Sequence, residues 1–218
     1  MKDCQTEILQ TVHSLCQEHL VLGTWGNVST REAQYFWITP SGMPYDCLKH
    51  DDLIKIDLAT GQAAGPWKAS TEWPLHAAIY RGRPDCAAVV HTHSVYATAF
   101  AVANLPIPPV VEDLVQIVGG GVAVADYALP GSKELAQQAL LALADNNAVL
   151  LANHGLVGIG KSLTEALTVC RIVEKTAQVV IQAKALGPIR EISQSDIKVM
   201  RQFYVTAYGP GHKREERP

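Results

Sequence analysis

Two short apolar segments constrain the fold of this chain more than any other feature. Residues 87–92 and 148–152 are apolar runs whose length fits a buried strand and falls short of a buried helix. Histidines lie at their ends, with His91 and His93 at the end of the first run and His154 two residues after the second. The chain therefore predicts a covered sheet with polar side chains gathered where two strands end.

Helices are expected to alternate with further strands along the chain. Apolar spacing, capping residues and breakers predict helices near 3–22, 71–81, 95–103, 131–144, 163–186 and 193–204, and strands within 26–39, 53–58 and 122–125. Residues 114–118 fit either type. The pattern indicates an α/β fold in a single domain, residues 1–209, with a polar tail at 210–218. Gly119-Gly120-Gly121 does not match the glycine pattern of a dinucleotide site.

Composition excludes several classes of partner. The formal net charge of the 218 residues is -3, so no basic surface for nucleic acid or an anionic membrane is expected. The N-terminus lacks a signal-peptide pattern, and no apolar stretch is long enough to span a bilayer. Five cysteines without a C-x-x-C pair point to free thiols in a reducing compartment, which we expect to be the cytoplasm.

The histidines at the strand ends form the main chemical signal. On a strand, side chains at i and i+2 point to the same side, so His91 and His93 should face one site. His154 can join them if the strand that it follows lies nearby. Three imidazoles with a free fourth position describe a catalytic metal site, although hydrogen-bonded structural histidines are the alternative interpretation. His76, one helical turn after Glu72, is expected beside this site without binding the metal.

A carboxylate and several small residues could complete the site. Ser70, Thr71 and Glu72 lie at the predicted start of a helix, where free backbone N–H groups attract an anion. Asn27 and the pair Ser41-Gly42 lie in predicted turns that could supply further donors for a phosphate. Ordinary helix capping and turn formation explain each segment equally well when it is taken alone.

The chain resembles the class II aldolase/adducin family, from about residue 5 to 209. No single sequence motif is specific for the family, but the whole series of motifs in this order is. The matching strings are GTWGNVS at 23–29, ITPSGMPY at 38–45, STEW at 70–73, RPD at 83–85, AVVHTH at 88–93, NHGL at 153–156 and TAYG at 206–209.

The resemblance implies a three-layer α/β/α fold around a mostly antiparallel central sheet, and a cyclic homotetramer with active sites at subunit interfaces. It implies zinc ligands at His91, His93 and His154, with Glu72 as the catalytic acid and base. It also implies that Tyr208 is a catalytic residue in the neighbouring subunit's site. The implied phosphate-binding residues are Asn27, Ser41, Gly42, Ser70 and Thr71.

The implied reaction is the reversible, zinc-dependent cleavage of a ketose 1-phosphate, of the L-fuculose 1-phosphate type, to dihydroxyacetone phosphate and an aldehyde. Asp113, beside Glu112, stands where the family's aldolases have a tyrosine, and Pro130 stands where they have a phenylalanine. Both positions lie near the aldehyde end of the substrate in those enzymes. We therefore expect a retained metal and phosphate site and an altered aldehyde pocket.

Other activities of the family use the same metal and phosphate site. They are a pentulose 5-phosphate 4-epimerase, a dehydratase of a thio-sugar phosphate and a decarboxylase of a keto-acid phosphate. The epimerases tend to have an aspartate where this chain has Glu72, which favours the aldolase. An adducin-like binding module would lack the metal ligands, and a zinc hydrolase would release phosphate. Three imidazoles would also accept cobalt or manganese.

Overall fold

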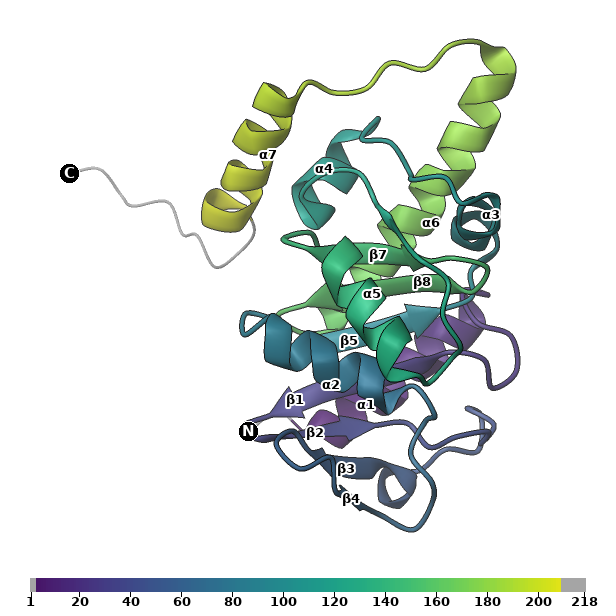
Figure 1. The fold of residues 1–218 in the computed structure, drawn as a ribbon, viewed down its shortest axis with the longest axis vertical. Coiled ribbons are helices and arrows are strands. Elements are labelled where there is room, and N and C mark those ends of the chain that lie inside the picture. The colour runs from purple at the N-terminus through teal and green to yellow at the C-terminus, as the bar shows by residue number, and fades with distance from the viewer. Residues whose placement is uncertain (1–2, 209–218) are drawn as a thin grey trace, which may run out of the picture.

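The computed structural model describes residues 3–208, which are built around one eight-stranded sheet (Figure 1). The strand order across the sheet is β4-β3-β2-β1-β5-β8-β7-β6. All neighbouring strands are antiparallel except the pair β6–β7. The strands are β1 (Asn27–Glu32), β2 (Tyr35–Ile38), β3 (Ile54–Asp57), β4 (Ala63–Ala64), β5 (Ala88–Thr92), β6 (Val124–Ala125), β7 (Ala148–Leu151) and β8 (Gly155–Gly160).

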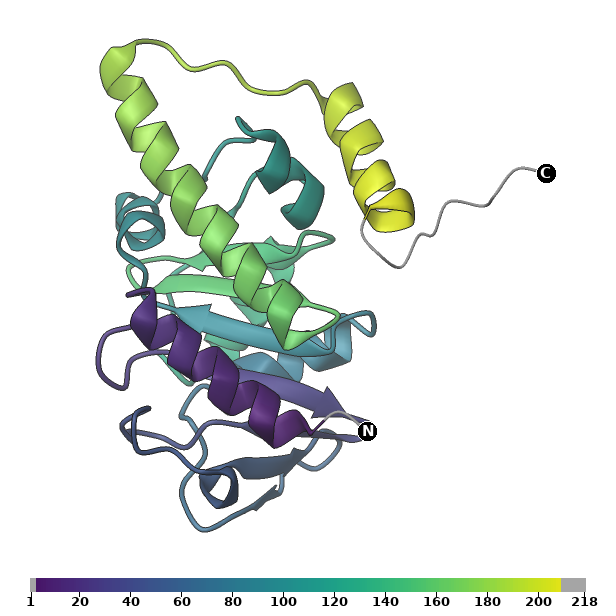
Figure 2. The same ribbon diagram turned by 180° about the vertical axis from the view of Figure 1, so that it is seen from behind.

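Helices cover both faces of the sheet, so the expected three-layer α/β/α fold is confirmed. Helices α2 (Trp73–Gly82) and α5 (Lys133–Leu143) lie on the face seen in Figure 1. Helices α1 (Cys4–Gln17) and α6 (Leu163–Leu186) cover the opposite face (Figure 2). Each face of the sheet has its own apolar core, and β5 contributes to both because its side chains point alternately to the two faces. Val89 packs towards α2 and α5, while Val90 packs towards α1 and α6.

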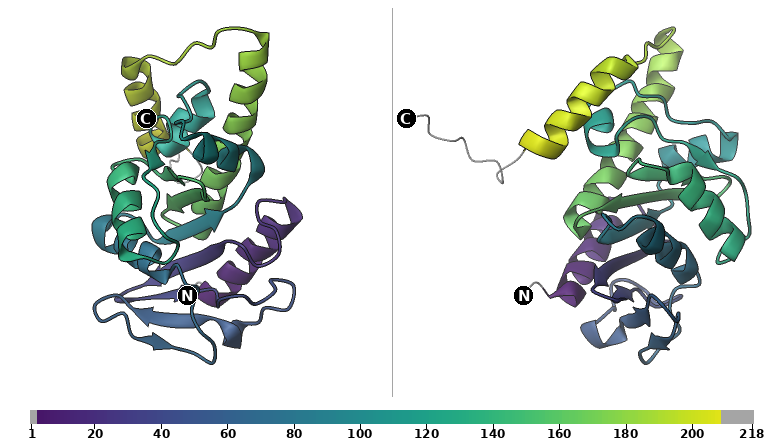
Figure 3. Two further views of the ribbon diagram at one scale, coloured as in Figure 1. Left: turned by 45° about the vertical axis from the view of Figure 1, so that its right-hand side comes forward. Right: turned by 60° about the vertical axis from the view of Figure 1, so that its left-hand side comes forward.

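Three further helices lie on the β7 side of the sheet, namely α3 (Val95–Ala103), α4 (Glu112–Val118) and α7 (Gln194–Ala207). A short 3₁₀ turn, η1 (His50–Asp52), lies on the other side, where it precedes β3 and contacts α1. A long segment leads from α6 to α7, which lies beside α4 (Figure 3). Nη1 of Arg201 on α7 donates to the carbonyls of Gln116 and Ile117, at 2.7 and 2.9 Å.

Strand β8 is the main element that sequence patterns do not predict. Glycines at 155, 158 and 160 dilute its apolar character, and glycine ordinarily disfavours a strand. In the structure a Cβ at Gly158 would lie 2.6 Å from Sγ of Cys170, on α6. Gly158 and Gly160, where a Cβ would lie 2.7 Å from the backbone N of Ala166, therefore let a long helix pack closely on the middle of the sheet.

The other differences are at element boundaries. Helix α1 ends at Gln17 and not near residue 22, and the expected strand at 122–125 shortens to β6. The ambiguous residues 114–118 belong to α4. No helix within residues 3–208 is long and apolar enough to cross a membrane. The domain limits of 1–209 stay a prediction, and the expected tail at 210–218 lies outside the described residues.

Candidate metal centre

The antiparallel pairing of β5 with β8 brings the three histidines together. Thr92 pairs with Leu156, so the end of β5 lies beside the start of β8. His91 and His93 come from the first strand, and His154 lies in the turn that leads from β7 into β8. The neighbour of β5 is therefore β8, which separates it from the apolar strand at 148–151 that the sequence suggested.

The three rings present their nitrogens to one point. Nε2 of His91 lies 3.0 Å from Nε2 of His93 and 3.3 Å from Nε2 of His154. The ligand atoms of all three lie within 4.8 Å of one another. A tetrahedral ion bound at ordinary metal–imidazole lengths separates its nitrogens by about 3.3 Å. The three side chains therefore fit a divalent metal with one position left for a substrate.

Hydrogen bonding and burial prepare these rings for a metal. Nδ1 of His91 lies 2.9 Å from the carbonyl of Leu156 and donates its proton there, which leaves the Nε2 lone pair free. Burial, together with the adjacent ring of His91, lowers the pKa of His93 to about 3 and that of His154 to about 4. Neutral imidazole is the form that binds metals. Nδ1 of His154 is buried without a hydrogen-bond partner.

Two residues that the sequence analysis did not single out shape the site. The ring of Trp25 stacks on His93 with centroids 6.3 Å apart. A Cβ at Gly155 would lie 2.3 Å from the carbonyl oxygen of Thr92 and 3.2 Å from Cδ2 of His93. Glycine is therefore required at 155 for the histidine rings to sit above this strand.

Glu72 faces the open side of the histidine cluster. Its Oε2 lies 3.2 Å from Nε2 of His91, and its Oε1 lies 3.5 Å from Nε2 of His154. Burial acts to raise the pKa of Glu72, but the adjacent imidazoles of His91 and His154 and a hydrogen bond from Asn27 outweigh it and lower the pKa. Oε1 is buried with no hydrogen-bond partner, so a ligand or metal can occupy its free side.

The start of α2 differs from the prediction. The sequence predicts a helix near 71–81, whereas in the structure Glu72 occupies the N-cap position, the helix begins at Trp73 and Pro74 follows within the first turn. The side chain of Glu72 makes no capping hydrogen bond. It is therefore free to point at the histidines, while the hydroxyl of Ser70 accepts from the Glu72 backbone N–H at 3.3 Å.

The segments expected to bind phosphate run side by side. The N–H of Thr39 donates to Val28, that of Ser41 to Lys68, and that of Ser70 to Thr39. These bonds place the turn at 41–42 and the segment before α2 beside the start of β1. Asn27 was expected in a turn but is the first residue of β1, where its side chain contacts Glu72. Ser41, Gly42 and Thr71 are exposed, whereas Asn27 and Ser70 are buried. The candidate residues Asn27, Ser41, Gly42, Ser70 and Thr71 thus come from adjacent backbone segments, and their part in binding phosphate stays a prediction.

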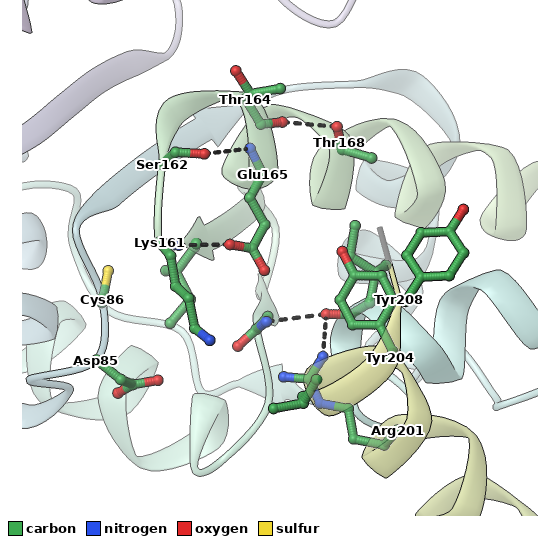
Figure 4. A pocket seen from close by; sticks show the side chains of 15 residues that line it. Asp85, Cys86, Lys161, Ser162, Thr164, Glu165, Thr168, Arg201, Tyr204 and Tyr208 are labelled. Atoms are coloured by element: carbon green, nitrogen blue, oxygen red, sulfur yellow. Dashed lines mark hydrogen bonds between the residues drawn. The ribbon is translucent and has the colours of Figure 1, made fainter. Parts of the chain in front are cut away.

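Tyr208 lies away from the histidines of its own chain. It is 60% exposed, and its ring stacks on Tyr204 with centroids 5.3 Å apart. Both tyrosines line a cavity of about 450 Å³ together with Asp85 and Lys161 (Figure 4). Asp85 precedes β5 and Lys161 follows β8, so the cavity lies at the strand ends opposite to the metal centre. Tyr208 therefore does not reach the metal centre of its own subunit in this structure.

The two positions that depart from the family pattern lie in different places. Asp113 forms an ion pair with Lys175 on α6. Pro130 is exposed and precedes Gly131, at which a Cβ would lie 2.7 Å from the carbonyl oxygen of Thr71. Pro130 therefore lies at the rim of the candidate phosphate site.

Comparisons with known proteins identify the family of this chain. Residues 6–181 match the Class II Aldolase and Adducin N-terminal domain, and the chain belongs to this family of metal-dependent aldolases. It is 35% identical over 204 residues to the L-fuculose phosphate aldolase of Escherichia coli O6:H1, covering 93% of this chain and 94% of that one.

Two further relatives extend the similarity. The 5-deoxy-D-ribulose 1-phosphate aldolase of Bacillus thuringiensis serovar kurstaki is 34% identical over 194 residues, covering 88% of this chain and 91% of that one. A solved structure of an L-fuculose 1-phosphate aldolase superposes with a TM-score of 0.90 at 32% identity. It covers 94% of this chain and 97% of that chain.

Proposed function

We propose that this protein is a zinc-dependent aldolase that reversibly cleaves a ketose 1-phosphate to dihydroxyacetone phosphate and an aldehyde. The observation that carries the proposal is the position of Glu72, whose carboxylate oxygens lie 3.2 Å from Nε2 of His91 and 3.5 Å from Nε2 of His154, two of the three convergent imidazole nitrogens. A metal site with a carboxylate at its open side suits proton transfer to a substrate carbon next to a carbonyl. The names of the relatives favour L-fuculose 1-phosphate or 5-deoxy-D-ribulose 1-phosphate as the substrate.

The chain's own residues divide the work of this reaction. The exposed turn at Ser41-Gly42 and the backbone N–H groups at the start of α2 bind the phosphate. Glu72 protonates the enediolate carbon of dihydroxyacetone phosphate after cleavage, and removes the same proton in the synthetic direction. The metal, when bound, supplies Lewis acidity that stabilises the negative charge developing on the substrate.

Tyr208 of a neighbouring subunit handles the proton on the aldehyde oxygen. The phenolic hydroxyl can both donate and accept, as this step requires. Support comes from the separation of Tyr208 from its own metal centre by the length of β5, which is about 16 Å for five residues. A head-to-tail ring brings opposite ends of neighbouring subunits together, and the proposed homotetramer is such a ring.

The proposed metal is zinc, because three imidazoles with an open position are a donor set typical of catalytic zinc. The five free cysteines, of which Cys86 and Cys170 are buried, fit the proposed cytoplasmic location. The proposed partner is a small phosphorylated sugar.

A coupled assay tests the proposal. The purified protein is incubated with L-fuculose 1-phosphate, 5-deoxy-D-ribulose 1-phosphate and other ketose 1-phosphates. Released dihydroxyacetone phosphate is followed through a dehydrogenase, with and without chelator. Chelator-sensitive release of dihydroxyacetone phosphate is the expected result. No release from any sugar by protein that retains its metal would refute the aldolase and direct the search to epimerase, dehydratase or decarboxylase substrates.

A further inference from the structure

The face of α2 that meets β1 carries polar side chains where apolar packing would be expected. Glu72, His76 and Tyr80 follow one another at intervals of four residues, beginning at the N-cap of the helix. Asn27 and Ser29 alternate along β1 on the same face of the sheet as His91. Four helical residues rise about 6 Å and two strand residues about 6.6 Å, so the two sets of side chains can interleave.

The interleaved side chains form one buried hydrogen-bonded series. Nδ2 of Asn27 lies 2.9 Å from Oε2 of Glu72, and Oδ1 of Asn27 lies 2.5 Å from Nε2 of His76. Oγ of Ser29 lies 2.6 Å from Nδ1 of His76 and 2.7 Å from the hydroxyl of Tyr80. The side chains of Ser29 and His76 are fully inaccessible to solvent.

The chemistry of these groups fixes the direction of each bond. An ionised carboxylate only accepts, so Asn27 must turn its amide N–H towards Glu72 and its oxygen towards His76. His76 must then donate from Nε2. Burial lowers the pKa of His76 to about 3, so the ring is neutral and carries one proton. Its Nδ1 therefore accepts from Ser29, whose oxygen accepts in turn from Tyr80.

We propose that His76 is a positioning residue for proton transfer, because its Nε2–H holds the Asn27 amide in the one orientation that donates to Glu72. This inference rests on the proposed function of Glu72 as the acid and base. Without the donor at His76, the amide of Asn27 can reverse and place its oxygen against the carboxylate. That arrangement repels Glu72 from the position in which it faces the substrate carbon.

Three variants separate positioning from simple packing. His76→Gln retains an N–H donor at nearly the distance of Nε2 from the backbone, whereas His76→Leu removes the donor. Ile79→Ala is the matched control, because Ile79 is fully buried on the same helix and contributes to the apolar core. Removing the Ile79 side chain leaves a cavity and lowers the stability of the fold, but it leaves the hydrogen-bonded series of polar side chains intact.

The measurement is the exchange of solvent deuterium into dihydroxyacetone phosphate, which needs Glu72 but no aldehyde. His76→Leu is expected to lower the turnover of exchange by about tenfold to a hundredfold, the scale of a small misplacement of a reacting group. Its KM and metal content should stay close to wild type. His76→Gln should recover most of the rate, and Ile79→Ala should exchange at the wild-type rate. Equal rates in His76→Leu and His76→Gln would overturn the proposal.

A second measurement does not depend on turnover. Proton–nitrogen correlation spectra of protein labelled at the histidine rings report the tautomer of each ring, and the signal missing in His76→Gln assigns His76. A proton on Nε2 is expected, whereas a ring protonated on Nδ1 or on both nitrogens overturns the proposal. A wild-type protein that neither cleaves nor exchanges any sugar phosphate would refute the proposed function, while this spectrum would still decide whether His76 orients Asn27.

Discussion

Oε2 of Glu72 lies 3.2 Å from Nε2 of His91, and the two side chains come from different layers of the molecule. Glu72 begins a helix that covers the sheet, and His91 belongs to a central strand. The contact joins the residue proposed to move a proton to a residue proposed to bind the metal. Proton transfer and metal binding can therefore be tested separately, by replacing Glu72 in one variant and a metal ligand in another.

Glu72→Gln should retain the metal and lose proton transfer. Glutamine keeps the size of the side chain and an oxygen that can accept from Asn27, but it is not basic, and loss of a general base costs about a hundredfold to ten-thousandfold in rate. Deuterium incorporation into dihydroxyacetone phosphate measures the step directly. Exchange at the wild-type rate in a variant with full metal content would contradict the assignment.

His154→Ala should lose the metal. Two imidazoles remain, and a metal bound with fewer ligands also stabilises the folded protein less. Metal content by elemental analysis should fall, and the melting temperature should no longer respond to chelator, whereas that of wild type drops on chelation. His13→Ala is the control, since His13 is exposed on α1. Full metal occupancy in His154→Ala would remove this residue from the ligand set.

His76 should make the metal-free protein sensitive to acid. Its pKa is about 3 in the folded protein and 6.5 ordinarily. As the pH falls below about 6.5, His76 is protonated in the unfolded chain but stays neutral in the folded protein. The free energy of unfolding therefore declines by about 1.4 kcal/mol per pH unit. The loss continues until the pH approaches the folded-state pKa.

The comparison uses urea unfolding of chelated protein at pH 7.5 and pH 5, values chosen to bracket the upper part of this range. His76→Gln should lose about 2 kcal/mol less than wild type over that interval. The exposed control His13→Gln should follow wild type. An equal acid loss in His76→Gln and wild type would show that His76 does not stay neutral when buried.

Mixed subunits should test the role of Tyr208. Glu72→Gln and Tyr208→Phe subunits are each expected to be poorly active alone. If each site combines Glu72 of one subunit with Tyr208 of the next, equal mixing after dissociation restores about a quarter of the sites in a head-to-tail ring. Restored cleavage of the ketose 1-phosphate is the expected result. Mixtures that form but stay inactive would show that Tyr208 serves no neighbouring site.

Local patterns predicted the elements that carry strong signals of their own. The span of α6, 163–186, follows from its Ser162 cap, whose hydroxyl accepts from the N–H of Glu165, and from Gly187 at its end. The strand with His91 and His93 follows from its apolar run. Strand β8 was not predicted, because its glycines are explained by neighbours outside the strand's own sequence. Gly158 and Gly160 lie against α6, and Gly155 lies against Thr92 and His93.

The sequence by itself determined the chemical inventory: three histidines, a carboxylate at a helix start, and the series of strings that marks the family. Only the tertiary structure decided which side chains meet. The pairing of β5 with β8 places His154 beside His91, and the packing of α2 on β1 links Glu72 through Asn27 to His76. Residues 27, 72 and 76 illustrate why the sequence could not predict these contacts. Contacts between distant segments depend on the strand order and on the similar rise per side chain of the helix and the strand, which no local pattern specifies.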